Sequence, residues 1–517
     1  MVTQRALTVI APIDPNKRES LQLIFRQMVP PLGDVATNPF VPFGKLSTLH
    51  FGRFVILEAT ETTPLQLSFS TNYDGLLEDH LYELDQEVGS GLSLIFSHCP
   101  DFQNDVCAFI RTHSLQPGAF YIGHRRRSRR QIGQEASLRN EIRQFLDSNR
   151  TAAGLPLHNQ SQQTIRREIQ EHIRRQARFS WAVQEPGLPA SLDRFIGLLP
   201  SIWIGGGMIV LLAALTTVLQ MVIIPNWSSI FAWNLFWKVA ICLIPLISFA
   251  IVYVKKGLIN PVSTKKNPWL LFVVLSAIFS FWVSIGLEIG RSLLVTLLIV
   301  VVIVGLIFLA INRVLTYLNG FEERQPQPVI AGKAHVANLL SRENLAGHGR
   351  VVVQNQLTHL VAIKPERFRV VTLKFVLWVI NLAAVVEYYK GELGGISSIH
   401  FAHWVLTDSN KRLIFYSNFD GSWENYLGDF TDKASEGLTG VWSNTIGFPK
   451  AHNLIGMGAR DEQRFKEWAR QNQIETQVWY SAYPDLSVLN INNNTRIRSD
   501  LFRPLSDKAL SKWCRRF

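Results

Sequence analysis

The chain has 517 residues, a formal net charge of +12 at pH 7 and a hydrophobic content of 47%. This length exceeds what one hydrophobic core usually contains and indicates about three structural units. The four cysteines show neither Cys-x-x-Cys nor metal-ligand spacing, which disfavours a zinc site and a disulfide framework, and the N-terminal residues lack the basic start and apolar run of a signal peptide.

The two ends of the chain repeat each other. Residues 67–102 align without a gap with residues 413–448, and a later block pairs Phe120-Tyr121 with Trp479-Tyr480. Because only two copies are present, the pattern indicates a duplication rather than a solenoid.

Each copy predicts the element order β-α-β-β-α-β. In the first copy we expect strands at 6–12, 46–57, 64–71 and 119–123, with helices at 18–29 and 76–88. In the second copy we expect strands at 357–363, 397–406, 412–417 and 476–482, with helices at 367–389 and 422–435. An additional helix precedes the last strand of each copy, near 105–112 and 461–471. This order is typical of a ferredoxin-like unit, in which helices cover one face of a sheet.

Both faces of the second strand are apolar. Phe54 and Ile56 alternate with Val55 and Leu57, whereas a sheet covered on one side should be polar on the other. We therefore expect the second copy to cover the free face of the first. The predicted fold class is α+β, with two ferredoxin-like repeats packed as an intramolecular barrel and a four-helix transmembrane insertion between them.

The predicted insertion rests on four apolar runs at 199–224, 233–254, 269–287 and 292–311. Each is about 20 residues long, which is the length that spans a bilayer, although four helices buried in a core are the alternative. Lysines at 255, 256, 265 and 266 mark the loop between the second and third runs as cytoplasmic, so both termini are expected in the cytoplasm. The pattern predicts a multi-pass bacterial inner-membrane protein.

These boundaries predict five segments. They are repeat 1 at 1–125, a basic and partly helical linker at 126–196, four transmembrane helices at 197–314, a linker at 315–353, and repeat 2 with a C-terminal extension at 354–517. Thirteen arginines lie between Arg125 and Arg178. We expect this stretch to contact an anionic lipid bilayer, because no aromatic interleaving or motif supports nucleic acid as the partner.

His50 and His400 occupy the same place in the two copies, at the start of the second strand. A duplicated histidine at an apolar position could be a ligand or a general base, or it could be a buried neutral ring bonded to the neighbouring strand. The turns Asn72-Tyr73-Asp74-Gly75 and Asn418-Phe419-Asp420-Gly421 follow the third strand of each copy. Asp74 and Asp420 could be helix caps, or acid–base partners of the two histidines.

Other candidate ligand-binding residues follow from the repeat. Tyr121 and Tyr480 are at matched positions, with His124 and Tyr483 three residues further on, and Arg498 matches Arg139. The second copy is the more aromatic, and His403 and Trp404 lie on its second strand, so we place the working pocket there. The candidate catalytic residues are then His400, Asp420 and Tyr480, and no metal site is expected.

The paired repeats resemble the dimeric α+β barrel group, which includes dye-decolourising peroxidases, chlorite dismutases and small monooxygenases. The resemblance covers about 5–125 and 354–492. The Asp-Gly of both turns matches the end of the peroxidases' Gly-x-x-Asp-Gly, but the first Gly of that motif is absent here. The block from Ser417 to Tyr426 also resembles uncharacterised bacterial membrane proteins. The resemblance implies haem as a cofactor by analogy only.

Together these patterns predict a membrane-anchored barrel that binds a small hydrophobic or lipid-derived molecule at the cytoplasmic face and could oxidise it. A non-catalytic membrane scaffold or sensor is the alternative, and a haem peroxidase-like enzyme is the second. Transport is disfavoured because the apolar runs carry almost no internal charge.

Overall fold

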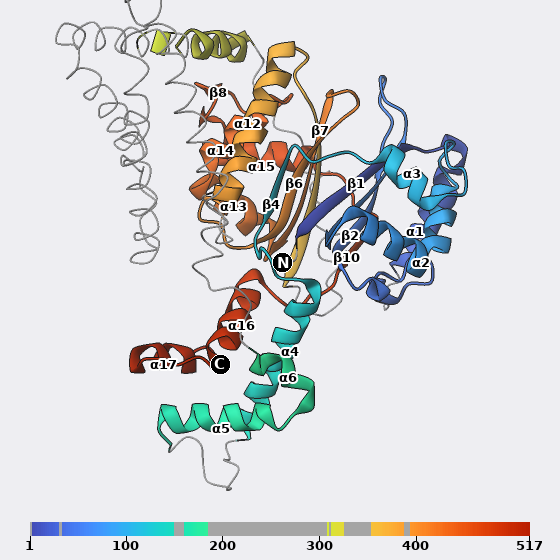
Figure 1. The fold of residues 1–517 in the computed structure, drawn as a ribbon. Coiled ribbons are helices and arrows are strands. Elements are labelled where there is room, and N and C mark those ends of the chain that lie inside the picture. The colour runs from blue at the N-terminus through green and yellow to red at the C-terminus, as the bar shows by residue number, and fades with distance from the viewer. Residues whose placement is uncertain are drawn as a thin grey trace, which may run out of the picture. The chain divides into compact units, whose positions relative to one another are not determined.

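The computed structural model describes residues 3–29, 34–148, 160–184, 305, 308–309, 312–324, 353–386 and 393–517. The chain divides into two compact units, one made of residues 1–187 and 319–517 and the other of residues 188–318. The first unit contains both repeats, and Figure 1 shows its helices and strands.

The first sheet is antiparallel and has the order β1 (Gln4–Pro12), β3 (Gln66–Asp74), β2 (Leu49–Leu57) and β10 (Val478–Ser481). Three helices cover its outer face, namely α1 (Arg18–Met28), α2 (Leu77–Phe96) and α3 (Val106–His113) (Figure 1). Side chains alternate along a strand, so Phe54 and Ile56 join the core beneath these helices while Val55 points to the other face.

The second sheet is built in the same way, in the order β4 (Ala119–Ile122), β6 (Ile399–Thr407), β7 (Arg412–Asp420) and β5 (Gln354–Ala362). Its outer core involves α12 (Arg367–Val386), α13 (Trp423–Lys433), α14 (Ser435–Trp442) and α15 (Glu462–Gln471). The short hairpin β8 (Ala451–His452) and β9 (Gly456–Met457) precedes α15.

The repeats exchange their last strands. β4 of repeat 1 pairs with β6 of repeat 2, and β10 of repeat 2 pairs with β2 of repeat 1. The segments leading into these strands also join the sheet edges, because Leu115 N donates to Thr8 O at 2.8 Å and Ile474 N donates to Thr358 O at 3.0 Å. The two sheets therefore form a closed, barrel-like pair.

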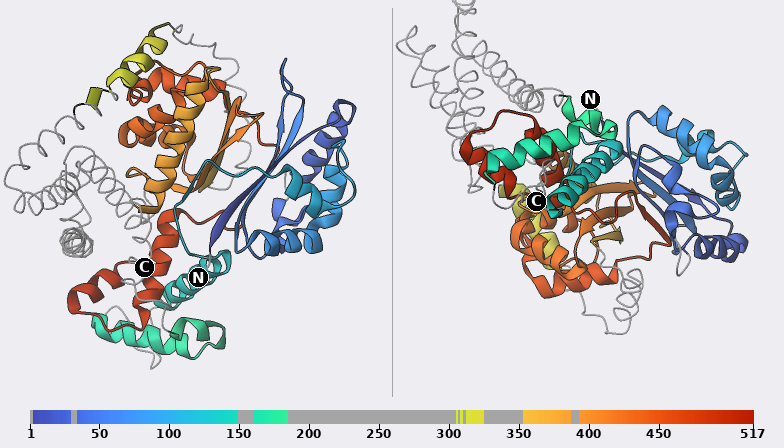
Figure 2. Two further views of the ribbon diagram at one scale, coloured as in Figure 1. Left: turned by 45° about the horizontal axis from the view of Figure 1, so that its top comes forward. Right: turned by 90° about the horizontal axis from the view of Figure 1, so that it is seen from below.

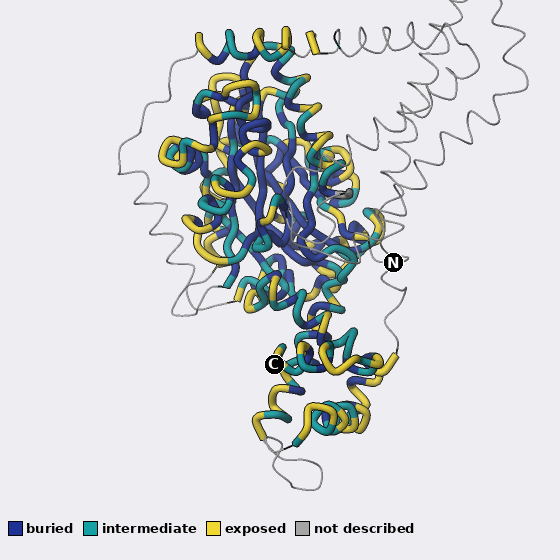
Figure 3. Tube along the Cα trace, turned by 90° about the vertical axis from the view of Figure 1, so that its left-hand side faces the viewer, coloured by how far each residue is buried: buried dark blue, intermediate teal, exposed yellow. Residues whose placement is uncertain are grey.

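The inner faces of the sheets pack on each other. Val55 and Leu57 from the first sheet meet Val405, Ile414 and Tyr416 from the second in one buried cluster. Figure 3 shows this burial as a continuous dark-blue centre, with exposed residues on the outer helices. The apolar character of both strand faces thus has a direct cause, since each sheet is covered on one side by helices and on the other by its partner.

A helix follows each exchanged strand. After β4 comes α4 (Arg129–Asp147), capped by Ser128, and after β10 comes α16 (Val488–Leu501), capped by Ser487. The two helices lie side by side (Figure 2) and bury Leu138 and Ile497 in a common cluster. The helices α5 (Gln162–Arg174), α6 (Ser180–Val183) and α17 (Asp507–Cys514) complete this cluster.

The structure corrects the predicted four-helix transmembrane insertion, and with it the multi-pass inner-membrane location. Within the described ranges, no helix is both long enough and apolar enough to cross a membrane. The most apolar long helix there, α12, contains Lys374 and Asn381 and buries Leu373 and Leu377 in the core of repeat 2. The predicted spans themselves lie outside the described residues, apart from Gly305 and residues 308–309.

Candidate functional site

The two duplicated histidines are placed by matching irregularities of the sheets. The register of β2 against β3 shifts between Leu49 and Phe51, and that of β6 against β7 shifts between Ile399 and Phe401. His50 and His400 are the extra residues at these shifts, and both are fully buried. A bulge of this kind redirects a side chain from its regular alternation.

Each histidine is bonded to the aspartate of its own repeat. Nε2 of His50 lies 2.9 Å from Oδ1 of Asp74, and Nε2 of His400 lies 2.7 Å from Oδ1 of Asp420. The other oxygen of each carboxylate accepts a backbone N–H from the first residue of a helix, Arg129 N at 2.7 Å or Val488 N at 2.8 Å. Because helix N-termini carry free N–H groups and a partial positive charge, both sites favour a carboxylate.

Tyr483 and His124 complete the arrangement, which we call the barrel-end cluster: His50, Asp74, His124, His400, Asp420 and Tyr483. Tyr483 follows β10 and His124 follows β4, so they occupy equivalent places after the exchanged strands. The Tyr483 hydroxyl lies 2.8 Å from Nδ1 of His50 and 3.1 Å from Nε2 of His124.

Gln4 sets the donor and the acceptor of each hydrogen bond in the series that runs from Gln4 to Asp74. Its Oε1 accepts from Arg126 N at 2.9 Å, so its Nε2 is the donor that faces Nδ1 of His124 at 3.4 Å. Nε2–H of His124 then donates to the Tyr483 oxygen, and the Tyr483 hydroxyl donates to Nδ1 of His50. Nε2–H of His50 donates in turn to Asp74. One consistent set of neutral imidazole tautomers satisfies the whole chain.

The two His–Asp pairs differ in the hydrogen bonding of the histidine Nδ1 atom. Nδ1 of His400 has no hydrogen-bond partner among the described residues, whereas the equivalent atom of His50 accepts from Tyr483. The Tyr483 ring lies between the pairs, with its centroid 5.8 Å from that of His50 and 6.0 Å from that of His400. The duplicated arrangement is therefore asymmetric: one pair is coupled to a hydroxyl and the other is not.

Burial fixes the charge state of the two central groups. Burial lowers the pKa of His124 well below its usual 6.5, and the nearby positive charge of Arg127 lowers it further. Burial also raises the pKa of the Tyr483 phenol well above 10, with Asp74 adding to the effect. At neutral pH His124 is uncharged and Tyr483 keeps its proton, as the direction of the hydrogen-bond chain requires.

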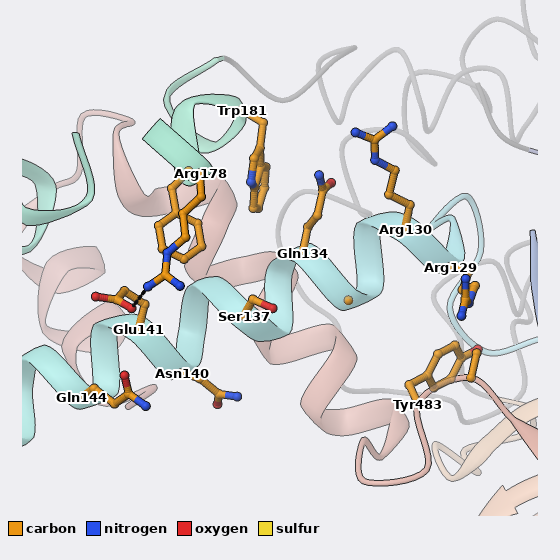
Figure 4. A pocket seen from close by; sticks show the side chains of 13 residues that line it. Arg129, Arg130, Gln134, Ser137, Asn140, Glu141, Gln144, Arg178, Trp181 and Tyr483 are labelled. Atoms are coloured by element: carbon orange, nitrogen blue, oxygen red, sulfur yellow. Dashed lines mark hydrogen bonds and ion pairs between the residues drawn. The ribbon is translucent and has the colours of Figure 1, made fainter. Parts of the chain in front are cut away.

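A groove along α4 leads to this cluster. Its volume is about 640 Å³, and its lining comes from α4, from the segment around α6 and from the end of β10. Tyr483 and Arg129 lie at one end, while Glu141 and Arg178 lie further along the helix (Figure 4). Within the described part of the chain, Tyr483 is the one member of the barrel-end cluster that lines the groove.

Three predicted ligand-binding residues are instead bonded inside the barrel. Arg53 donates to the side chain of Asn418 and to the carbonyl oxygens of Ser417 and Leu357, each at 3.2 Å. Asn418 also donates to Asn72 at 3.1 Å. Burial without a carboxylate partner lowers the pKa of Arg53 to about 10. His403, the equivalent of Arg53, contacts Thr8 at 3.3 Å, and burial lowers its pKa to about 3.

The remaining predicted residues lie in the cores or on α16. Tyr480 stacks on Phe43 with centroids 5.2 Å apart, and Trp404 stacks on Phe415 at 4.6 Å. Tyr121 is buried in the core of repeat 2, and Arg498 lies over the Trp181 ring at 5.8 Å. Of the predicted residues, the structure therefore brings only the two histidines and the two aspartates into the barrel-end cluster.

Tyr483 and His124 were visible in the sequence only as residues three positions after a duplicated tyrosine. Their importance depends on the strand exchange, because β10 carries Tyr483 from repeat 2 to His50 of repeat 1. Sequence periodicity gives no signal for such an exchange.

The described residues do not fit a metal ion or a haem group. They contain no group of three or more His, Cys, Asp or Glu side chains with the geometry of a metal site. The ring of His400 is enclosed by Phe51 and His124, both at 5.5 Å, and by Tyr483 at 6.0 Å between centroids, which leaves no room for a porphyrin beside its nitrogen.

Comparison with known proteins gives no further assignment. No protein-family profile, curated protein or solved structure matches this chain.

Proposed function

We propose that this protein binds a small molecule in the α4 groove and acts on it by acid–base chemistry, with Tyr483 as the group that meets the ligand. The observation that carries the proposal is the hydrogen-bonded series Asp74–His50–Tyr483, whose last member lines the groove. A hydroxyl bonded to a histidine that is itself oriented by a carboxylate is the arrangement that activates a hydroxyl nucleophile or proton donor.

The distances support direct proton transfer. The phenol oxygen lies 2.8 Å from Nδ1 of His50, within the reach required of a general base. A raised pKa keeps Tyr483 protonated at rest, so its reaction as a nucleophile needs a base to take the proton during the step. Asp74 stabilises the imidazolium that His50 then becomes, and the N-terminus of α4 holds Asp74 in place.

The polar lining of the groove leads us to propose a polar ligand rather than the hydrophobic one suggested by the sequence. Its side chains include Gln134, Ser137 and Asn140 as well as arginines. The volume of about 640 Å³ is within the usual range for small-molecule sites.

A purely structural role of the same residues is the competing proposal. It is favoured by the bonds from Asp74 and Asp420 to the first residues of α4 and α16, which fasten the helices that follow the exchanged strands. In this case Tyr483 would stabilise the fold and have no unusual reactivity.

Benzenesulfonyl fluoride separates the two proposals without knowledge of the substrate. The Tyr483 oxygen would attack sulfur and displace fluoride, while its proton passes to Nδ1 of His50. Labelled peptides are identified by mass spectrometry, and the rate of labelling is compared between the parent, His50→Gln and Tyr480→Phe. We expect labelling at Tyr483, a loss of about 100-fold in His50→Gln and an unchanged rate in Tyr480→Phe.

Equal rates in the parent and His50→Gln, or no label on Tyr483, would favour the structural role. Circular dichroism of each variant verifies that the fold is retained before rates are compared.

A further inference from the structure

The charges of the α4 groove are unbalanced. Three arginines line it, Arg129, Arg130 and Arg178, against the single carboxylate of Glu141. The Glu141 carboxylate already has partners, because it pairs with Arg178 and lies 2.7 Å from Nε2 of His172. No carboxylate among the described residues forms an ion pair with Arg129 or Arg130.

Both arginines lie at the end of the groove that meets the barrel-end cluster. Nη2 of Arg129 already donates to Gly44 O at 3.3 Å, whereas no hydrogen bond or ion pair of the Arg130 side chain is found among the described residues. Arg129 and Arg130 are the first two residues of α4, so the partial positive charge of the helix N-terminus adds to theirs. Arg129 also lies close enough to Tyr483 to lower the pKa of the phenol, opposing the effect of burial.

One wall of the groove is aromatic. Trp181 lines the groove together with Gln134, which lies one turn of α4 beyond Arg130 (Figure 4). Arg498 lies over the Trp181 ring with its guanidinium carbon 5.8 Å from the ring centroid. A flat ring can therefore stack against a fixed indole while its charged group reaches the helix terminus.

We propose that the groove selects an aromatic anion, a carboxylate or a phosphate ester. Its negative group is held by Arg130 at the N-terminus of α4, and its ring packs against Trp181. This inference specifies the class of ligand for the proposed function. Only the labelling experiment below rests on the proposed reactivity of Tyr483, and the binding experiment does not. Arginine suits both anions because its planar guanidinium can form two parallel hydrogen bonds.

Two reagents of nearly the same size test the inference. Labelling of Tyr483 by 4-(fluorosulfonyl)benzoic acid, which carries a carboxylate, is compared with labelling by neutral benzenesulfonyl fluoride. We expect the anionic reagent to react at least tenfold faster at low concentration. Arg130→Gln should remove about tenfold of that advantage and leave the neutral reagent unaffected.

Arg143→Gln is the matched control, because Arg143 is exposed on the same helix and does not line the groove. Titration calorimetry with phenyl phosphate and with benzoate gives a readout that does not need Tyr483 to react. We expect Arg130→Gln to weaken the binding of both and Arg143→Gln to bind as the parent does. The ratio of the two affinities then shows whether a phosphate or a carboxylate is preferred.

The outcomes separate this inference from the proposed function. Labelling of Tyr483 at equal rates by both reagents would overturn the anion inference and leave the proposed chemistry standing. Anion binding that depends on Arg130, without labelling of Tyr483 by either reagent, would support the inference and overturn the chemistry. Binding of either anion that is as strong in Arg130→Gln as in the parent would overturn the inference.

Discussion

Replacing Tyr483 by Phe should destabilise the barrel although it removes only one oxygen atom. The hydroxyl bridges the repeats, since it bonds to His50 at 2.8 Å and to His124 at 3.1 Å. Both rings are fully buried, so each would keep a ring nitrogen without its hydrogen-bond partner. A buried polar group left without a partner costs about 1–3 kcal/mol, and two such groups give an expected loss of about 2–6 kcal/mol.

Urea unfolding followed by circular dichroism measures this loss, with Tyr480→Phe as the control. Tyr480 belongs to the same exchanged strand and stacks on Phe43, and its hydroxyl interacts with Arg129 instead of with either histidine. We expect the control to lose no more than about 1 kcal/mol, the net worth of an ordinary hydrogen bond. Equal losses in the two variants would refute the bridging role of the Tyr483 hydroxyl.

Three further predictions concern the duplicated site and its surroundings. His50→Gln should lose more stability than His400→Gln, because His50 uses both ring nitrogens and His400 uses one; equal unfolding free energies would contradict this. Gly123→Ala should lower the free energy of unfolding by at least about 2 kcal/mol, because the new Cβ would lie 2.0 Å from Ile399 O. In Gly133→Ala on α4 the new Cβ meets nothing within 4 Å, so this variant should be as stable as the parent or more stable. Acid should destabilise the fold between about pH 6.5 and 3, because histidines of the unfolded chain bind protons in this range and the buried ones do not. The free energy of unfolding should fall by about 1.4 kcal/mol per pH unit for each such histidine. A urea midpoint that is the same at pH 7 and pH 5 would contradict this. Burial lowers the pKa to about 3 in each of His80, His359 and His403.

Local elements of the repeats could be predicted because each has a clear sequence signal. The sequence predicts the second strand at 46–57, and the structure has β2 at Leu49–Leu57. It predicts a helix near 105–112, and the structure has α3 at Val106–His113. The third strand runs further than expected, to Asp74, because Asn72 and Tyr73 pair with β1 and are not yet part of the turn. Strand pairing overrides turn propensity at these positions.

The composition of the site depended on features that a single sequence does not display. The pairing of His50 with Asp74 and of His400 with Asp420 follows from the repeat and from adjacent strands within each copy. Tyr480 was the wrong tyrosine to place beside them, because its alternation on β10 directs it to the core of repeat 1. Tyr483 lies beyond the end of that strand, where alternation no longer applies, and only the strand exchange brings it to His50.

The duplicated site is asymmetric because Tyr483 is bonded to His50 and not to His400. Long-range proton–nitrogen NMR of the histidine rings at pH 7 tests this asymmetry directly, since the nitrogen shifts report which nitrogen carries the proton. We predict that His50 and His124 are neutral with the proton on Nε2, and that Tyr483→Phe shifts Nδ1 of His50 and Nε2 of His124 while leaving Nδ1 of His400 in place. A proton on Nδ1 of His50 or His124, or an equal response of His400, would contradict the account.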